Sequence, residues 1–287
     1  MEKRTFQYDD VMFDLVISGG DSFTFGSELS VDDMHPNENC WANLVAQRIG
    51  KRHINTAKGG RSNSFISRRV LKQIENAESA GIKNNKIFVQ IMWTFSSRHE
   101  VALGYHHEDY DSPWAWITQY SSINETDSDW FRQIKNRDNN YKTLKQHLNS
   151  KFQKNKSLGI VDYAKAYNKV TQGTVLNNTY VSLKDILLLQ SILKSKNIPY
   201  LFLYNDYHCY EDLCIRPLRD EGIEYIKMYR NLIDFDKWFT FPGAYGFKDW
   251  AKENNYKFAT THPLHKAHKD AAELVYNYIK TNIGISN

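Results

Sequence analysis

Residues 16–26 read Val-Ile-Ser-Gly-Gly-Asp-Ser-Phe-Thr-Phe-Gly, and this stretch decides the fold that we expect. The mostly apolar run at residues 12–17 predicts a buried strand, and two glycines end it before Asp21 and Ser22. Such a strand presents the residues that follow it at the carboxyl edge of its sheet, where open α/β sheets bind ligands. Ser22 is therefore a candidate nucleophile if a base lies within reach. The alternative interpretation is an ordinary turn, which these residue types commonly form.

A second informative segment lies near the other end of the chain, where Thr261, His262 and Pro263 precede a helical pattern. Proline suits the first turn of a helix, because its missing N–H is not needed there. His262 is thereby expected on the short connector in front of the helix, where an imidazole can serve as a base. The alternative is a surface or capping histidine.

Three short blocks of sequence carry the functional signal. The first is Gly20-Asp21-Ser22, the second is Asn55 followed by Gly60, and the last is His262-Pro263 with Ala267-His268 after it. In order and spacing these blocks resemble the SGNH (GDSL-type) hydrolase family. Residues 10–95 and 180–285 carry the resemblance, which implies that Ser22 is the nucleophile and His262 its base.

Two positions depart from the pattern of that family. Its third block has an asparagine after a central strand, but residues 92–98 read Met-Trp-Thr-Phe-Ser-Ser-Arg. A Trp-Thr-x-x-x-Arg version of this block resembles SGNH-like proteins of tailed bacteriophages, which suggests a bacteriophage-encoded variant. The family also has an acid three residues before the histidine, where this chain has Ala259. A backbone carbonyl can take its place, or a carboxylate from a loop-like position: Asp21, Asp206 or Asp249.

An ester under attack by serine develops negative charge on its carbonyl oxygen, and this charge needs hydrogen-bond donors. The backbone N–H groups of Ser22 and Gly60 are the first candidates, because glycine lets a backbone approach closely. The resemblance implies a third donor from an asparagine side chain, which this chain lacks at the expected position. The candidate replacements are Asn63, Thr94, Ser96 and Arg98.

The alternation of strand and helix patterns predicts a doubly wound parallel α/β sheet of about five strands, flavodoxin-like and of the SGNH hydrolase type. Strands are expected at residues 12–18, 52–57, 86–93, 199–204 and 223–228, and helices at residues 39–49, from 64 onward and at 181–196. The chain, residues 1–287, is expected to form a single domain. Its strand ends would then bring Ser22, Gly60 and Thr94 to one edge.

Residues 99–179 are expected to form a helical, aromatic-rich insertion after the third strand, with an amphipathic helix within 128–156. Because the insertion leaves the carboxyl end of that strand, it is predicted to lie over the site as a lid or side wall. Its tryptophans and tyrosines either stack on sugar rings or pack into a small core of their own. His106, His107 and Asp109 are poor metal ligands, because adjacent residues of an extended segment point to opposite sides.

Composition limits the remaining classes of function. With 37 basic and 33 acidic side chains, the net charge of +4 is too small to predict nucleic-acid binding. Three cysteines in 287 residues do not form a disulfide framework, and no stretch is apolar enough for a signal peptide or a membrane span. The expectation is a cytoplasmic protein without a cofactor, metal, nucleic-acid or membrane partner, and its oligomeric state stays open.

These residues predict a serine esterase with a Ser22–His262 dyad or triad. The resemblance implies a small acyl group, acetyl, carried on a carbohydrate, so the partner would be a small-molecule or glycan ester. One alternative is an O-acyltransferase, in which a sugar hydroxyl replaces water. The other is a non-catalytic binding protein that kept the fold.

Overall fold

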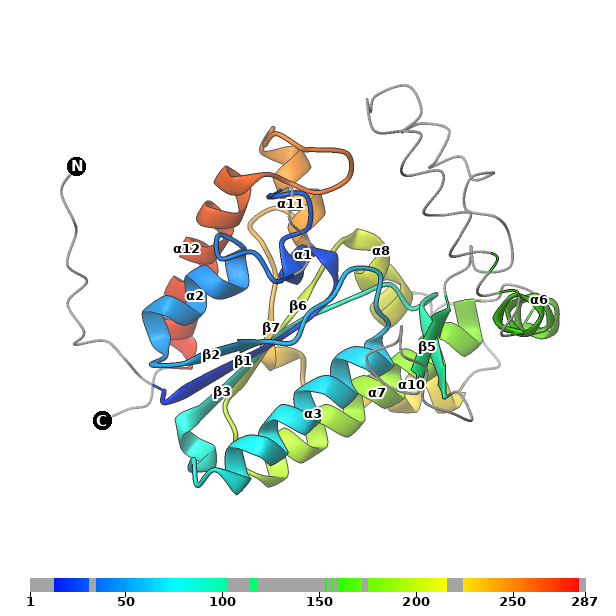
Figure 1. Ribbon diagram of the computed structural model, residues 1–287, viewed down its shortest axis with the longest axis horizontal. Helices are drawn as coiled ribbons and strands as arrows, with labels where there is room; N and C mark the ends of the chain where they lie inside the picture. The colour runs from blue at the N-terminus through cyan, green and yellow to red at the C-terminus, as the bar shows by residue number, and fades with distance from the viewer. Residues whose placement is uncertain are drawn as a thin grey trace.

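The computed structural model describes residues 13–30, 35–102, 114–117, 153, 156, 159–171, 175–215 and 224–283. In this part of the chain the main sheet has five strands in the order β2-β1-β3-β6-β7, and every neighbouring pair is parallel (Figure 1). The strands are β1 (Leu15–Gly19), β2 (His53–Asn55), β3 (Ile87–Trp93), β6 (Tyr200–Tyr204) and β7 (Trp238–Phe239). The predicted doubly wound, flavodoxin-like α/β fold is confirmed.

The central strands are buried on both faces, as their apolar sequences predict. Every residue of β1, β3 and β6 is buried, and β1 pairs with β3 in the register Leu15↔Ile87 to Gly19↔Ile91. Helices cover both faces, which explains why these strands are continuous apolar runs and do not alternate with polar residues. Ser18 of β1 and Gln90 of β3 are polar exceptions: the Gln90 amide donates to Ser18 Oγ and to the carbonyl of Ala42, each at 2.8 Å.

Two layers of helices enclose the sheet. One core lies between the sheet and the helices α3 (Asn63–Ser79), α7 (Val175–Ser195) and α10 (Glu224–Asn231). The other lies against α2 (Trp41–Ile49), α11 (Phe247–Glu253) and α12 (His265–Asn282). Figure 1 shows α2 and α12 on one side of the strands and α3 and α7 on the other. The helices predicted at 39–49, from 64 and at 181–196 correspond to α2, α3 and α7.

The prediction of a strand at residues 223–228 is wrong, because Glu224–Asn231 is the helix α10. Ile226 is fully buried and Tyr229 packs against the same core, which is helical spacing, whereas Met228 is exposed. The fifth strand is β7, which has only two residues and pairs with β6. A segment this short has no periodicity that a sequence pattern can reveal.

The segment after β3 begins with a strand pair and not with a helix. β4 (His99–Ala102) and β5 (Trp114–Ile117) form an antiparallel pair, and α6 (Ile160–Thr171) follows later in the chain. The predicted helical insertion thus contains a strand pair as well as the helix α6 in its described part. The amphipathic helix predicted within 128–156, and the histidines at 106 and 107, lie outside the described residues.

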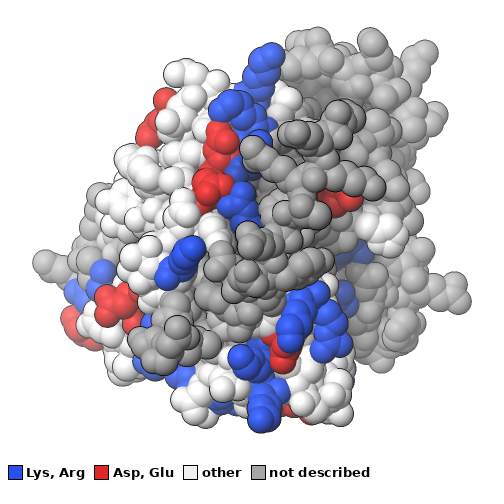
Figure 2. Space-filling model, turned by 90° about the vertical axis from the view of Figure 1, so that its left-hand side faces the viewer, with Lys and Arg blue, Asp and Glu red and all other residues white. Residues whose placement is uncertain are grey.

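The strands begin at the edge of the sheet that lies opposite their carboxyl ends, and this edge is basic. Lys51, Arg52, Lys83 and Lys86 line a hollow there with Asp14, and Lys51 pairs with Asp14 at 2.7 Å. Figure 2 faces this side and shows Lys and Arg side chains in several groups among fewer acidic ones.

The cysteines Cys40, Cys209 and Cys214 are buried and free. Within the described ranges, no helix has the length and apolar character that a membrane span needs.

Gly246, in the loop between β7 and α11, lies against the carboxyl end of β6, and this close approach leads to a first prediction. It bridges to Tyr204, and a Cβ at this position would overlap the backbone of Asp206. Because backbone cannot move aside as a flexible side chain can, Gly246→Ala is expected to lower the free energy of unfolding by about 1–3 kcal/mol. Urea denaturation followed by circular dichroism measures the change.

Gly59→Ala is the matched control. A Cβ there would meet only Ser27 Oγ at 3.6 Å and Ser22 Cβ at 3.8 Å, which are ordinary contacts. Its effect is expected within about 0.5 kcal/mol. Equal stability of the two variants would contradict the tight approach at Gly246.

Candidate active site

Ser22 begins a short helix directly after the first strand. The helix α1 (Ser22–Phe25) starts where Asp21 Oδ1 accepts the N–H of Phe23 at 3.1 Å, which is an N-cap contact. Gly20 is required in front of it, because a Cβ would overlap Thr24 Oγ1. The side chain of Ser22 is thereby held at the carboxyl edge of the sheet, with 8% of the residue exposed.

His262 lies beside Ser22 although 240 residues separate them in the sequence. Its Nε2 is 2.8 Å from Ser22 Oγ. The imidazole also packs against the ring of Phe23, with centroids 4.8 Å apart and planes tilted by 54°. The structure therefore brings together the two residues that the sequence analysis selected as nucleophile and base.

Glu28 is the carboxylate partner of His262, and the sequence analysis missed it. Its Oε2 lies 3.0 Å from His262 Nδ1 and also accepts the backbone N–H groups of Thr260, Thr261 and His262, each at 3.1 Å. A carboxylate only accepts, so Nδ1 carries the proton and Nε2 is free to accept from Ser22 Oγ. The three side chains form one hydrogen-bonded chain in the order Glu28, His262, Ser22.

Hydrogen bonds keep Glu28 charged, and they also offset the strain of its backbone. Partial burial opposes ionisation, but the hydrogen bonds from the His262 side chain and from the backbone outweigh it and lower the pKa of Glu28 to about 2. Its backbone has φ of 68°, in the left-handed region that side chains other than glycine seldom adopt. The contacts to residues 260–262 offset the cost of this conformation, which is about 1–3 kcal/mol.

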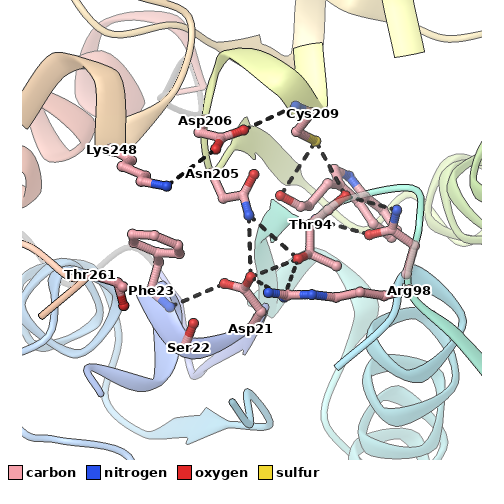
Figure 3. Close-up of polar contacts among 12 residues, drawn as sticks. Asp21, Ser22, Phe23, Thr94, Arg98, Asn205, Asp206, Cys209, Lys248 and Thr261 are labelled. Atoms are coloured by element: carbon pink, nitrogen blue, oxygen red, sulfur yellow. Dashed lines mark hydrogen bonds and ion pairs between the residues drawn. The ribbon is translucent and has the colours of Figure 1, made fainter. Parts of the chain in front are cut away.

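The three acids considered from sequence lie elsewhere. Asp21 Oδ2 accepts from Thr94 Oγ1 at 2.6 Å, from Arg98 Nη1 at 2.7 Å and from Asn205 Nδ2 at 3.2 Å (Figure 3). Asp206 accepts the N–H of Cys209 at 3.1 Å and lies 3.7 Å from Lys248 Nζ. Burial raises the pKa of Asp249, and the main chain of Tyr207 bonds to its carboxyl. None of their described contacts reaches His262.

The sequence analysis did not predict Glu28, because this residue occupies no position of the family's sequence motifs. The family pattern places the acid next to the histidine, whereas Glu28 follows the serine by six residues and is next to the histidine only in space. Two features of the sequence could have indicated Glu28: Ala259 stands where the family has its acid, and an acidic residue follows soon after Ser22.

Two backbone N–H groups remain available near Ser22 Oγ. Among the described residues, no hydrogen-bond acceptor is assigned to the N–H of Ser22 or of Gly60. The loop that carries Gly60 passes alongside the serine, since a Cβ on Gly59 would be 3.8 Å from Ser22 Cβ. Gly60 itself has φ of 73° with open space where a side chain would lie. Both groups therefore remain candidates for oxyanion donors.

Each of the four candidate side-chain donors has a hydrogen-bond partner among the described residues. Asn63 donates to the carbonyl of Thr94 at 3.1 Å and to Ser182 Oγ at 3.0 Å, and its oxygen accepts the N–H of Thr94 at 2.9 Å. Ser96 Oγ donates to Asp212 at 2.6 Å. Thr94 and Arg98 both donate to Asp21, as described above. These contacts hold the loop after β3 in place.

The second histidine of the last block has a packing role. His268 is fully buried, and its Nδ1 accepts the N–H of Trp41 at 3.1 Å. Burial is the main cause that lowers the pKa of His268 to about 3, so the ring is neutral at ordinary pH. It packs edge-on against Phe247, with centroids 4.9 Å apart. His268 thus anchors α12, whose preceding connector carries His262.

The comparisons with known proteins assign no activity to this chain. No family model and no curated protein matches this chain. One similar solved structure is the psychrotrophic esterase EstA from Pseudoalteromonas sp., in a form inhibited by monoethylphosphonate, with 13% identity, coverage of 93% of this chain and 97% of that chain, and a TM-score of 0.42. Another is a member of the lipolytic protein G-D-S-L family from Veillonella parvula DSM 2008, with 10% identity, coverage of 92% and 98%, and a TM-score of 0.39. Both TM-scores lie below 0.5, so neither assigns an activity to this chain.

No group of three or more His, Cys, Asp or Glu side chains suited to a metal ion occurs in the described part of the chain.

The low pKa of Glu28 predicts a specific loss of stability in acid. Its pKa falls from the usual 4.5 to about 2 on folding, so its contribution is present above pH 4.5 and is lost as the pH falls toward 2. The difference in free energy of unfolding between wild type and Glu28→Gln is therefore expected to be larger at pH 6 than at pH 3. Urea denaturation at both pH values measures it.

Glu253→Gln is the control for this comparison, because Glu253 is exposed on α11. Its difference from wild type is expected to stay the same at both pH values. A difference for Glu28→Gln that is equally independent of pH would contradict the proposed pairing with His262.

Proposed function

We propose that this protein is a serine hydrolase of carboxylic esters, with Ser22 as nucleophile, His262 as general base and Glu28 as the acid of the triad. The observation that carries the proposal is the hydrogen-bonded chain from Glu28 through His262 to Ser22 Oγ, with distances of 3.0 and 2.8 Å. These are the distances at which a base can take the proton of an attacking hydroxyl.

In the first half-reaction, Ser22 Oγ attacks the carbonyl carbon of the ester while its proton passes to His262 Nε2. The carbonyl oxygen becomes an oxyanion, which the N–H groups of Ser22 and Gly60 stabilise. Glu28 holds the ring with its Nδ1 proton in place and stabilises the imidazolium. Collapse of the intermediate breaks the bond to the leaving alcohol, which takes the proton from Nε2 and leaves an acyl-serine.

In the second half-reaction, a water molecule gives a proton to His262 Nε2 and its oxygen attacks the acyl carbon. The same two N–H groups stabilise the second oxyanion. When this intermediate collapses, the bond to Ser22 Oγ breaks and Oγ recovers the proton from Nε2. The products are the carboxylic acid and the free enzyme.

The arrangement supports assignment to the SGNH hydrolase type. The serine after β1, the glycine loop after β2 and the histidine before α12 follow the family's order, on a parallel sheet with flavodoxin order. Two departures distinguish this chain. Its acid comes from the loop after the serine, and the asparagine donor is absent, so the oxyanion is expected to rely on backbone groups.

We propose a small acyl group, with acetyl as the first choice. Ser22 is only 8% exposed, and Phe23 and His262 pack beside it, so a bulky acyl chain would have little access to Oγ. Carbohydrate is the proposed carrier of the acyl group.

The first test is pre-steady-state hydrolysis of 4-nitrophenyl acetate. Wild type is expected to release a burst of nitrophenol stoichiometric with enzyme if deacylation is the slower half, and Ser22→Ala is expected to lose at least about 10³-fold in kcat. Ser195→Ala, at the far end of α7, is the control and should behave as wild type. Equal inertness of wild type and Ser22→Ala toward several esters would favour a non-catalytic binding protein.

The second test concerns the identity of the acid. Glu28→Gln removes the charge that stabilises the imidazolium, so its kcat is expected to fall by about 10²- to 10⁴-fold while KM changes much less. Asp249→Asn, at one of the acids considered from sequence, is expected to stay within a few-fold of wild type. A large loss in Asp249→Asn without one in Glu28→Gln would overturn the assignment.

A further inference from the structure

Three tyrosines lie together at the same edge of the sheet as Ser22, and Tyr207 and Tyr245 among them are exposed. Tyr207 and Tyr210 belong to α8 (Tyr207–Tyr210), and Tyr245 lies just before α11. The rings of Tyr210 and Tyr245 are stacked, with centroids 3.6 Å apart and planes within 8°. Tyr207 lies 6.1 Å from Tyr210 and 6.0 Å from Tyr245. We call these three residues the tyrosine platform; Tyr207 is 39% exposed and Tyr245 is 41% exposed.

The platform is close to the candidate active site. It follows the carboxyl ends of β6 and β7, and β6 is two strands from β1, which is about 10 Å. Ring contacts also lead from His262 to the segment that carries Tyr245. Phe247, two residues after Tyr245, contacts Phe23 with centroids 6.3 Å apart, and Phe23 contacts His262. A substrate of two or three linked rings would reach from Ser22 to the platform.

The platform is held rigidly by the core below it. Tyr210 packs edge-on against the buried ring of Tyr204, with centroids 5.4 Å apart. The backbone of Gly246 is in tight contact with that of Asp206, so the two loops that carry the tyrosines cannot separate freely. A surface ordered in advance loses little entropy when a ligand binds.

The surroundings of the platform are polar. His208 and Glu211 adjoin Tyr207 and Tyr210 in the sequence, with 3.7 Å between Nδ1 and Oε2, and Lys248 pairs with the buried Asp206 beside the candidate site (Figure 3). Flat aromatic faces within a polar rim match a sugar ring, which has C–H groups on its faces and hydroxyls around its edge. An extended acyl chain would instead require a continuous apolar groove.

We propose that the tyrosine platform is a carbohydrate subsite that binds the sugar residues of the ester substrate. This inference rests on the proposed function, because it assigns the alcohol side of that substrate. It differs from the expectation that tryptophans and tyrosines of the insertion stack on sugars, since its three residues lie on the loops after β6 and β7.

The test measures binding without turnover. Full-length Ser22→Ala is titrated, with intrinsic fluorescence and saturation-transfer NMR as readouts, against tetrasaccharides of β-1,4-linked glucose, xylose and N-acetylglucosamine and their O-acetylated forms. At least one is expected to bind. Adding Tyr207→Ala or Tyr245→Ala is expected to weaken that binding about tenfold, whereas adding Tyr207→Phe, which keeps the ring, should change it by less than about threefold.

Tyr163→Ala in the same background is the matched control. Tyr163 is 48% exposed and stacks on Tyr167, but it lies on α6, which Figure 1 draws far from α1 and α8. Thermal unfolding of each variant checks that it folds, and if one of the two alanine variants does not fold, the other one carries the test.

Several outcomes would overturn the proposal: no tetrasaccharide binds, the platform variants bind as tightly as their parent, or Tyr163→Ala weakens binding equally. In the active enzyme, a selective loss of 4-nitrophenyl octanoate hydrolysis in Tyr207→Ala would also overturn it, because it would assign the platform to acyl chains. A failure of the proposed hydrolase activity appears separately, as the absence of 4-nitrophenyl acetate turnover in wild type.

Discussion

The buried carboxylate of Asp21 is the contact on which the rest of the site depends. One of its oxygens caps α1, and the other accepts from the segments that follow β3 and β6. Arg98 supplies the opposite charge at 2.7 Å, which offsets the cost of burying an anion. The carboxyl ends of three strands are thereby tied to one group, and Ser22 takes its position from the residue before it.

A second carboxylate organises the other half of the site. Glu28 joins the loop after α1 to the connector before α12 through His262 Nδ1 and the backbone of residues 260–262. It therefore orients the imidazole and holds the segment that carries it. Asp21 thus positions the proposed nucleophile, and Glu28 positions the proposed base.

The ring contacts join this site to the edge of the sheet beyond it. Phe23 contacts both His262 and Phe247, and the loop that leads into Phe247 carries Tyr245. Residues that shape the reacting centre and residues that would bind the rest of a substrate therefore rest on one packed cluster. Close packing of this kind transmits small displacements, so the geometry at Ser22 is coupled to the loops after β6 and β7.

The sequence by itself predicted the parallel sheet from local patterns, and it predicted the pair of Ser22 and His262 through the resemblance of three short blocks to a known family. Continuous apolar runs that end at glycines, and proline at a helix start, are local signals, because strand burial and helix initiation depend on neighbouring residues. Only the tertiary structure decided that Glu28 pairs with His262, that Asn63 and Thr94 hold a loop in place, that β7 is the fifth strand and that Tyr210 stacks on Tyr245. These contacts join residues far apart in the chain, or involve segments of two to four residues. Such pairings leave no periodic pattern in the sequence, since they depend on where the folded backbone brings each side chain.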